Sequence, residues 1–339
     1  MKNKISTIAR FIFFLGIGIF FIWLFMRNLT HDQKKEIMLS FRKANYAWIV
    51  LAVLLGILSH LLRSLRWKML MEPMGYIPRS SNVFFAVMIG YLANLVLPRL
   101  GEVSRCGILT RYEKIPFTKS FGTVITERAV DMIMFFILFF TTIYIQSDRL
   151  SSYIQTRVYD PLAAKFQFTI DFSAFFIFVS IGIGLVLIAG LIILWRLMRR
   201  SAFLQKLKAQ ILGFLEGIKS LGSIKQPLLF IFYSLAIWTL YLLMAYFVFY
   251  SLADTAMLGL DAGLGVLIFG SIGIMVVQGG IGIYPAIVAE TLILYSISKT
   301  TGYAMGWLIW SSQTLTVICL GILSLILLPL LNKTANVKS

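Results

Sequence analysis

Charged side chains are scarce in this sequence. Asp, Glu, Lys and Arg make up only 13% of the 339 residues, whereas 59% are hydrophobic; soluble domains carry about 25% charged residues. Histidine and cysteine are scarcer still, with two of each. His31 and His60 lie far apart, as do Cys106 and Cys319. The sequence therefore predicts neither a zinc site nor a disulfide framework.

Catalytic motifs are also lacking. No Ser-His-acid or Cys-His pairing is suggested anywhere in the chain. The glycine-rich stretch at 278–282 lacks the Lys-Ser/Thr of a phosphate-binding loop and no nucleotide-binding strand context precedes it. We therefore expect no catalytic residues, no metal and no cofactor, and we expect that the chain is not an enzyme.

The charge that is present is mostly positive. Against 14 acidic residues stand 31 Lys and Arg residues, which gives a formal net charge of +17. Nucleic-acid binding would require a basic soluble domain, which the sequence does not contain. Basic loops that face the cytoplasm and anionic lipid explain the excess better.

Long hydrophobic runs dominate the chain and predict an all-α integral membrane protein. A helix needs about 20 mostly apolar residues to cross the hydrocarbon core. Basic residues precede the first run and no small-residue cleavage motif follows it, so we expect an uncleaved transmembrane helix there. Six segments qualify as full transmembrane helices: 7–26, 46–66, 118–146, 172–197, 227–252 and 302–331.

Two further apolar segments are interrupted. Residues 82–97 end at Pro98, and 262–277 end in Gln278-Gly279-Gly280 before a second short run. Irregular backbone at membrane depth is tolerated only where protein or a polar cavity surrounds it. We predict two re-entrant broken hairpins, at 82–115 and 262–298.

The distribution of positive charge orients the chain. With both hairpins re-entrant and both termini cytoplasmic, 22 of the 31 Lys and Arg residues lie on the cytoplasmic side and 9 outside, as the positive-inside rule requires. Residues 172–331 then repeat the topology of residues 1–146 upside down. Inverted repeats with discontinuous helices are a transporter architecture, with the site between the two breaks.

The segment at 196–226 is the largest predicted cytoplasmic feature. Apolar residues recur there at steps of three or four, with lysines off the stripe, which suits an amphipathic helix on an anionic leaflet. An ordinary connector explains the segment equally well. The stripe comprises Leu204, Leu207, Ile211, Leu215 and Ile218.

The densest polar cluster surrounds the first break. Pro98 stops the first half-helix, Gly101 permits a tight turn, and Glu102 complements the positive end of the next half-helix. Free N–H groups at that end, together with the arginines, would bind a phosphate. The alternative is that the arginines reach the headgroups and Glu102 is only a cap. The candidate headgroup-binding residues here are Asn94, Arg99, Gly101, Glu102 and Arg105.

A second cluster enters the long apolar helix at 118–146. Glu127 and Asp131 are four residues apart and share a helix face, where Arg128 can neutralise Asp131. Ionisable residues in a bilayer are costly and usually face the bundle interior. Their role is functional, or a structural ion-pair network that ties this helix to Arg99 or Arg105, or both.

A third cluster follows the second break. Three glycines within four residues predict a backbone that bends or closely approaches another segment, and Pro285 suits the first turn of the next half-helix. A glycine seam between packed helices is the alternative. Gly279, Gly280, Gly282 and Tyr284 complete the candidate headgroup site, and Glu290 is added to the charge network.

These motifs resemble a known family. The string Leu97-Pro98-Arg99-Leu100-Gly101-Glu102-Val103-Ser104-Arg105, then Glu127-Arg128-Ala-Val-Asp131 and the glycine stretch, is similar to the lysylphosphatidylglycerol synthase transmembrane (flippase-like domain) family. That family forms the N-terminal membrane half of the multiple peptide resistance factor, MprF. The resemblance covers nearly the whole chain but no soluble aminoacyl-transferase domain, so the "synthase" label does not imply catalysis here.

The resemblance implies translocation of an anionic or aminoacylated lipid between leaflets. We therefore expect a lipid flippase or isoprenoid-carrier transporter in a bacterial inner membrane, whose partners are membrane lipids and not nucleic acid. Only the headgroup needs to cross a polar groove, since the acyl chains can stay in lipid. The alternatives are a non-transporting partner subunit of a lipid or glycan synthase, and an intramembrane lipid transferase. Association of the chain as a homo-oligomer is left open.

Overall fold

The computed structural model describes residues 29–97, 99–166 and 224–333, with single positions between 16 and 27, between 171 and 190, and at 222. The chain forms two compact units: residues 1–142 with 217–339, and residues 143–216. Every element assigned in the described ranges is helical. The predicted spans 7–26 and 172–197, Pro98 and the connector 196–226 lie wholly or mostly outside the described residues.

Four described helices are long and apolar enough to cross a bilayer. They confirm four predicted helices at nearly the predicted positions. The one clear difference is at the end of the first of them, which was expected at residue 66. That helix runs to Met71, continues into the 3-10 turn η1 (Glu72–Met74), and stops at Gly75 with φ 85°. The four are α3 (Tyr46–Met71), α6 (Phe117–Ile145), α11 (Pro227–Phe249) and α14 (Lys299–Lys333).

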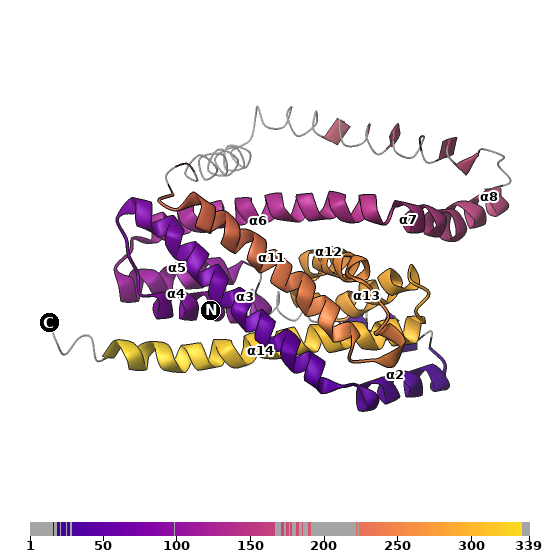
Figure 1. The fold of residues 1–339 in the computed structure, drawn as a ribbon, viewed down its shortest axis with the longest axis horizontal. Helices are drawn as coiled ribbons and strands as arrows, with labels where there is room; N and C mark the ends of the chain where they lie inside the picture. Colours follow the sequence, from indigo (N-terminus) through magenta and orange to yellow (C-terminus); the bar gives the residue numbers. More distant parts are fainter. Residues whose placement is uncertain are drawn as a thin grey trace. The chain divides into compact units, whose positions relative to one another are not determined.

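Two pairs of shorter helices occupy the predicted hairpins. They are α4 (Ser80–Val96) with α5 (Leu100–Glu113), and α12 (Leu260–Val276) with α13 (Ile283–Ile293), the latter pair joined through η5 (Gln278–Gly280). At 1.5 Å per residue each helix is about 16–26 Å long, short of the roughly 30 Å hydrocarbon core. The order long, short, short, long therefore occurs twice along the chain (Figure 1).

Local caps set the remaining boundaries. A capping box begins α2 (His31–Lys43), in which Thr30 and Gln33 satisfy each other's backbone N–H groups. The side chain of Asn45 caps α3, and Pro227 occupies the first turn of α11, where its missing N–H costs nothing. The 3-10 turn η4 (Ala253–Thr255) lies between α11 and α12.

The second unit is described in part. Its helix α7 (Ser147–Ile154) passes through a π-helical turn, η2 (Gln155–Tyr159), into α8 (Asp160–Phe166). Tyr159 packs its ring edge-on against Phe172 and Phe175.

In the first unit, α14 is the helix on which both hairpins pack. It runs past α4 and α13 in Figure 1 and contacts both. Glycines allow these close approaches: Gly302 and Gly306 face α13, and Gly321 faces Leu92 of α4. Small residues four apart let membrane helices approach backbone to backbone. This helix therefore fixes where the two hairpin tips lie.

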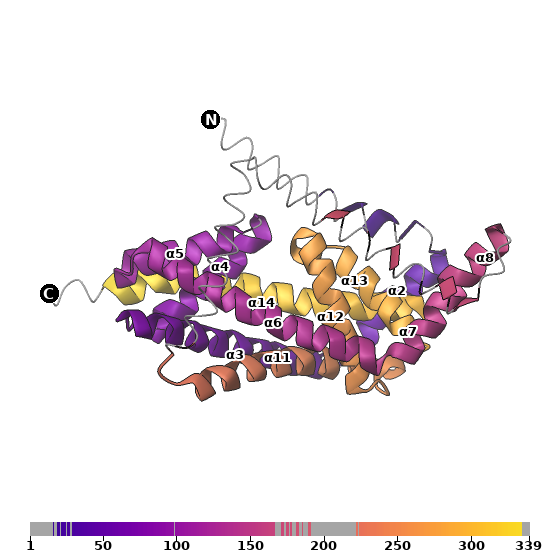
Figure 2. The same cartoon turned by 90° about the horizontal axis from the view of Figure 1, so that it is seen from above.

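The helices α3 and α11 form the other main contact. They pack antiparallel, side by side in both views (Figures 1 and 2), and the N–H of Asn45 donates to the carbonyl of Ser251 at 2.8 Å where one begins and the other ends. Gly56 of α3 makes room for the side chain of Met244. The apolar core of α3, α11, α13 and α14 surrounds this contact.

A substitution tests the contact between α14 and α13. A Cβ atom at Gly306 would lie 2.5 Å from the Cα of Pro285, which is backbone and cannot move away cheaply. We expect Gly306→Ala to destabilise the protein by about 1–3 kcal/mol, seen as a lower unfolding temperature in detergent. Gly122→Ala is the matched control, because nothing lies within 4 Å there and alanine favours the helix by up to about 1 kcal/mol. Equal unfolding temperatures for the two variants would contradict the packing argument.

Candidate functional site

Of the two carboxylates on one face of α6, Glu127 is buried and Asp131 is largely buried. The Glu127 side chain is 0% exposed and that of Asp131 is 13% exposed. A buried ionised carboxylate is very costly unless it is paired and hydrogen-bonded. The structure therefore has to supply cations to this face of α6.

Three arginines from two other helices meet these carboxylates. Arg63 of α3 bridges the pair, with Nη1 2.8 Å from Glu127 Oε1 and 2.6 Å from Asp131 Oδ2. Arg66, one turn further along α3, places Nη2 2.7 Å from Asp131 Oδ1. Arg105 of α5 places Nη1 2.8 Å from Glu127 Oε2. The buried network thus joins α3, α5 and α6.

Aromatic and hydroxyl groups complete the network. The Arg105 guanidinium lies 4.6 Å from the centre of the Trp67 ring, a cation–π contact. The Trp67 Nε1–H donates to Thr123 of α6 at 2.9 Å. Arg66 donates to Ser234 Oγ, and Arg63 to the hydroxyl of Tyr241 at 3.3 Å, both on α11. The network therefore reaches α11 as well.

The buried network carries an excess of positive charge. Three guanidinium groups, each 7% exposed or less, face two carboxylates. Arginine stays protonated in proteins, so protonation cannot balance the excess. The cluster therefore favours a further anion nearby.

The pairing expected between Arg128 and Asp131 is not found. Arg128 instead donates to Glu102 of α5 at 2.7 Å. The reason is that Arg63 and Arg66 already occupy both oxygens of Asp131. The Arg128 side chain is 49% exposed, so this pair is a weaker link than the buried network.

Arg63 and Arg66 belong to this network, and the sequence analysis did not include them among its candidate site residues. They were counted as cytoplasmic charges because the helix was expected to end at residue 66. In the structure α3 continues to Met71, so neither arginine lies at the helix end, and both are buried. Their spacing of three, which puts them on one helix face, is the signal that could have identified them.

The first hairpin turn differs from expectation at Gly101. The residue in the left-handed conformation is Arg99, with φ 64°, and its side chain is exposed. Gly101 lies inside α5, where a Cβ atom would collide with the carbonyl oxygen of Gly90 on α4. Its small size is thus required for the crossing of α4 and α5 rather than for the turn.

Hydrogen bonds already use part of the helix end at this turn. Asn94 Oδ1 accepts from the Gly101 N–H at 2.7 Å, and the Leu97 carbonyl accepts from the Leu100 N–H. These are two of the four donors that a helix start leaves unpaired. The expected phosphate site at this end therefore has fewer free N–H groups than the sequence suggested.

The second hairpin tip bends at its glycines, as predicted. Gly279, Gly280 and Gly282 have φ of 69°, 69° and 74°, a region that favours glycine. Trp310 Nε1 of α14 donates to the Gly279 carbonyl at 2.6 Å. A Cβ atom at Gly279 would lie 3.8 Å from the side chain of Leu95, so the two hairpin tips are neighbours.

A cavity of about 430 Å³ lies where the tips approach each other. Residues of α3, α4 and α6 line it together with residues of α11, α12, α13 and α14. Leu95 and Gly279 contribute from the two hairpin tips. Two cations, Arg63 and Arg128, line it, and the described lining residues include no Asp or Glu. Its hydrogen-bonding groups are Tyr91, Tyr241, Tyr284, Ser271, Trp310, Gln313, Thr314 and His60.

Only some of the predicted site residues line this cavity. Arg128, Gly279 and Tyr284 do so. Glu290 pairs with Lys299 at 2.6 Å, apart from the α6 network. The predicted residues outside the lining are Asn94, Arg99, Gly101, Glu102, Arg105, Glu127, Asp131, Gly280, Gly282 and Glu290.

Long apolar helices, two short helix pairs and a buried arginine–carboxylate network define a multi-pass helical membrane protein. The chain belongs to the family described as lysylphosphatidylglycerol synthase TM region, which matches residues 11–321. The resemblance seen in the sequence is thereby confirmed.

A curated relative also matches part of the chain. A UPF0104 membrane protein of Methanocaldococcus jannaschii is 34% identical over 146 residues, which are 42% of this chain and 40% of that protein. No solved structure matches.

The network makes a prediction about stability. Glu127→Gln removes a buried charge, takes away the carboxylate that Arg105 faces and leaves Arg63 with Asp131 alone, so we expect a loss of about 3–5 kcal/mol, measured by unfolding in detergent. Glu290→Gln breaks a pair whose two side chains are 44% and 49% exposed and should cost no more than about 1 kcal/mol. Similar losses in both variants would show that the buried network does not stabilise α6 specially.

Proposed function

We propose that this protein moves an anionic lipid, aminoacylated or isoprenoid-linked lipids included, from one membrane leaflet to the other. The observation that carries the proposal is the cavity between the hairpin tips, lined by Arg63 and Arg128 and by no acidic residue among those described. The family's description, which names a lysyl-modified phosphatidylglycerol, agrees with a lipid ligand. The proposal assigns transport rather than catalysis to this chain.

The chemistry of the cavity suits a phosphate. Guanidinium groups bind phosphate oxygens with short, charge-assisted hydrogen bonds. Arg63 is held in place by Glu127, Asp131 and Tyr241, so its position is fixed before the ligand arrives. The hydroxyl groups of Tyr91 and Tyr241 line the same space. A bound phosphate would also offset the excess positive charge of the buried network.

The two hairpins would control access to the cavity. In the topology that the positive charges predict, α4–α5 enters from the cytoplasmic side and α12–α13 from outside, as in inverted-repeat transporters. Their neighbouring tips would block the path of the headgroup between the two leaflets. The Trp310–Gly279 hydrogen bond would hold the second tip in this blocking position. We assign the protein to a bacterial cytoplasmic membrane with both termini inside.

Sidedness of labelling tests this topology. In a Cys319→Ser background, cysteines at Arg79 and Arg111 flank the first hairpin, and cysteines at Met257 and Lys299 flank the second; all four positions are exposed. An impermeant maleimide should label the first pair only from the cytoplasmic side and the second pair only from outside. A pair whose two members react from opposite sides would make that hairpin a full crossing.

Transport itself is tested in vesicles. Purified protein is reconstituted with a headgroup-labelled anionic phospholipid, and a reductant bleaches the outer leaflet. Wild type should expose the protected label, and Arg128→Gln should slow this roughly tenfold, because one charge-assisted hydrogen bond to the phosphate is lost. Lys119→Gln removes the same charge from an exposed site on α6 and should leave the rate unchanged.

Arg128→Gln is suited to this test because it breaks a pair outside the buried network, in which the Arg128 side chain is 49% and the Glu102 side chain 19% exposed, so it should cost less than breaking the buried network. Its unfolding temperature should therefore stay close to that of wild type. Wild-type vesicles that behave like empty vesicles across several anionic lipids would count against autonomous transport. That result would favour a non-transporting partner subunit of a lipid or glycan synthase.

A further inference from the structure

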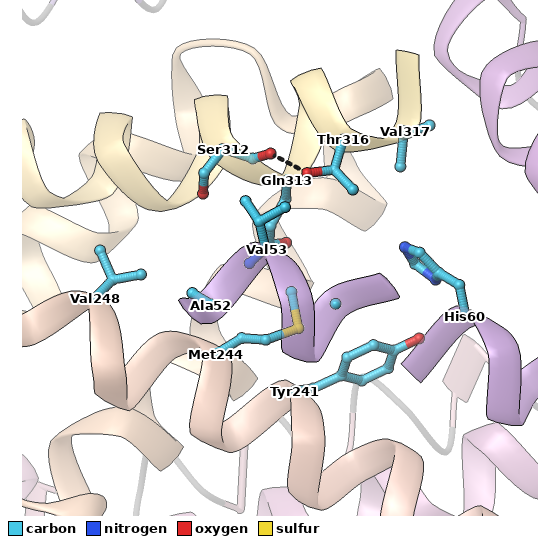
Figure 3. Close-up of a pocket in the computed structure, with 11 residues that line it drawn as sticks. Ala52, Val53, His60, Tyr241, Met244, Val248, Ser312, Gln313, Thr316 and Val317 are labelled. Carbon is cyan, nitrogen blue, oxygen red and sulfur yellow. Dashed lines mark hydrogen bonds between the residues drawn. The ribbon is translucent and has the colours of Figure 1, made fainter. Parts of the chain in front are cut away.

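Two more cavities extend from the cavity at Arg63 and Arg128, which we call the headgroup cavity: one adjoins it and the second adjoins the first. The first, of about 80 Å³, lies among α3, α11 and α14 (Figure 3) and shares His60, Tyr241 and Gln313 with the headgroup cavity. The second, of about 400 Å³, is a groove between α3 and α14. It shares Val53 and Ser312 with the small cavity. The small cavity is thus a neck between the headgroup cavity and the groove.

The groove has the surface of a hydrocarbon site. Apart from Tyr46 and Cys319, its lining is aliphatic except for three hydroxyl residues of α14. Each of these hydroxyls donates back to its own helix: Ser311 to Trp307, Ser312 to Ile309, and Thr316 to Ser312, at 2.6–2.8 Å. No hydroxyl donor is left over for a polar ligand, and the small side chains leave room for methylene groups.

The neck is more polar than the groove. His60 and Tyr241 project into it from α3 and α11 (Figure 3). The Nδ1 atom of His60 is buried and has no hydrogen-bond partner. An unpaired buried polar atom is costly, so this position suits a ligand with a polar group, such as the ester that joins an acyl chain to the glycerol of a phospholipid.

The order of these surfaces follows the order of groups in a lipid. The groove touches α3 between Tyr46 and Ile57, and Arg63 lies six residues beyond, or about 9 Å along the helix. The charged headgroup cavity, the polar neck and the apolar groove therefore follow one another along α3. In the predicted topology the groove lies in the outer half of the bilayer.

Building on the proposed function, we propose that the groove between α3 and α14 holds a hydrocarbon chain of the transported lipid. Its phosphate then lies in the cavity at Arg63 and Arg128, and its ester linkage lies in the neck at His60. The hydrocarbon chain is thus bound by the protein during transport and does not remain in the surrounding bilayer. Selection would then act on the whole lipid and not only on its headgroup.

Photo-crosslinking tests this inference. The protein is reconstituted in phosphatidylcholine vesicles containing, as a minor component, either phosphatidylglycerol or phosphatidylcholine with a diazirine in one acyl chain. Crosslinked peptides are then mapped by mass spectrometry. The exposed face of α6 at Phe136, Ile137 and Phe140 is the internal reference for bulk lipid. We expect the phosphatidylglycerol-to-phosphatidylcholine ratio of crosslinks in the groove to exceed that reference several-fold.

Occlusion of the groove provides the second arm. Val53→Phe fills the junction of neck and groove and should bring the crosslink ratio down to the α6 reference and slow transport several-fold. Leu315→Trp, at an exposed groove position, is a second occluding variant in case Val53→Phe does not fold. Ile137→Phe, a similar change on the bulk-lipid face of α6, should change neither quantity.

The outcomes separate this inference from the proposed function. Active transport with groove crosslinks at the reference ratio would overturn the groove assignment and leave transport standing. A groove crosslink ratio above the α6 reference, without transport, would support a hydrocarbon-chain site in the groove and count against transport. Arg128→Gln should reduce the enrichment, since the phosphate anchors the chain; full enrichment in that variant would overturn the link between groove and cavity.

Discussion

The structure depends on the burial of two carboxylates in a helix with little water around it. Glu127 is fully buried and needs positive charge on several sides. Arg63, Arg66 and Arg105 provide it from α3 and α5. Because a partnerless buried charge is so unfavourable, these pairs favour α3 and α5 as the neighbours of the first half of α6, where apolar residues pack as well. Aromatic residues hold its second half against α11 and α12.

The same constraint connects stability with function. Three arginines around two carboxylates leave an excess of positive charge, and Arg63 directs part of it into the cavity between the hairpin tips. The glycines of α14 and of the second tip bring the backbones close enough for those tips to meet there. A ligand phosphate would therefore meet a site whose charges and walls are already in place, which reduces the cost of ordering on binding.

Local rules explain how much of this could be predicted. The long helices followed from apolar runs of sufficient length, and the two hairpins from short runs that end near Pro98 or at Gly279–Gly280. The left-handed glycines of the second tip followed from their spacing. In each case residues a few positions apart carry the signal, because helix length, helix ends and tight bends are determined by neighbouring residues.

By itself the sequence determined the four long described helices, the two breaks, the membrane class and the family. Only the tertiary structure decided the partners: Arg63 and Arg66 with Asp131, Arg128 with Glu102, and the small residue at Gly101 with its neighbour on α4. These contacts join residues from different helices, up to 68 positions apart. Hydropathy describes single segments along the chain, whereas a buried charge is satisfied by whichever cation the packing brings within hydrogen-bond distance.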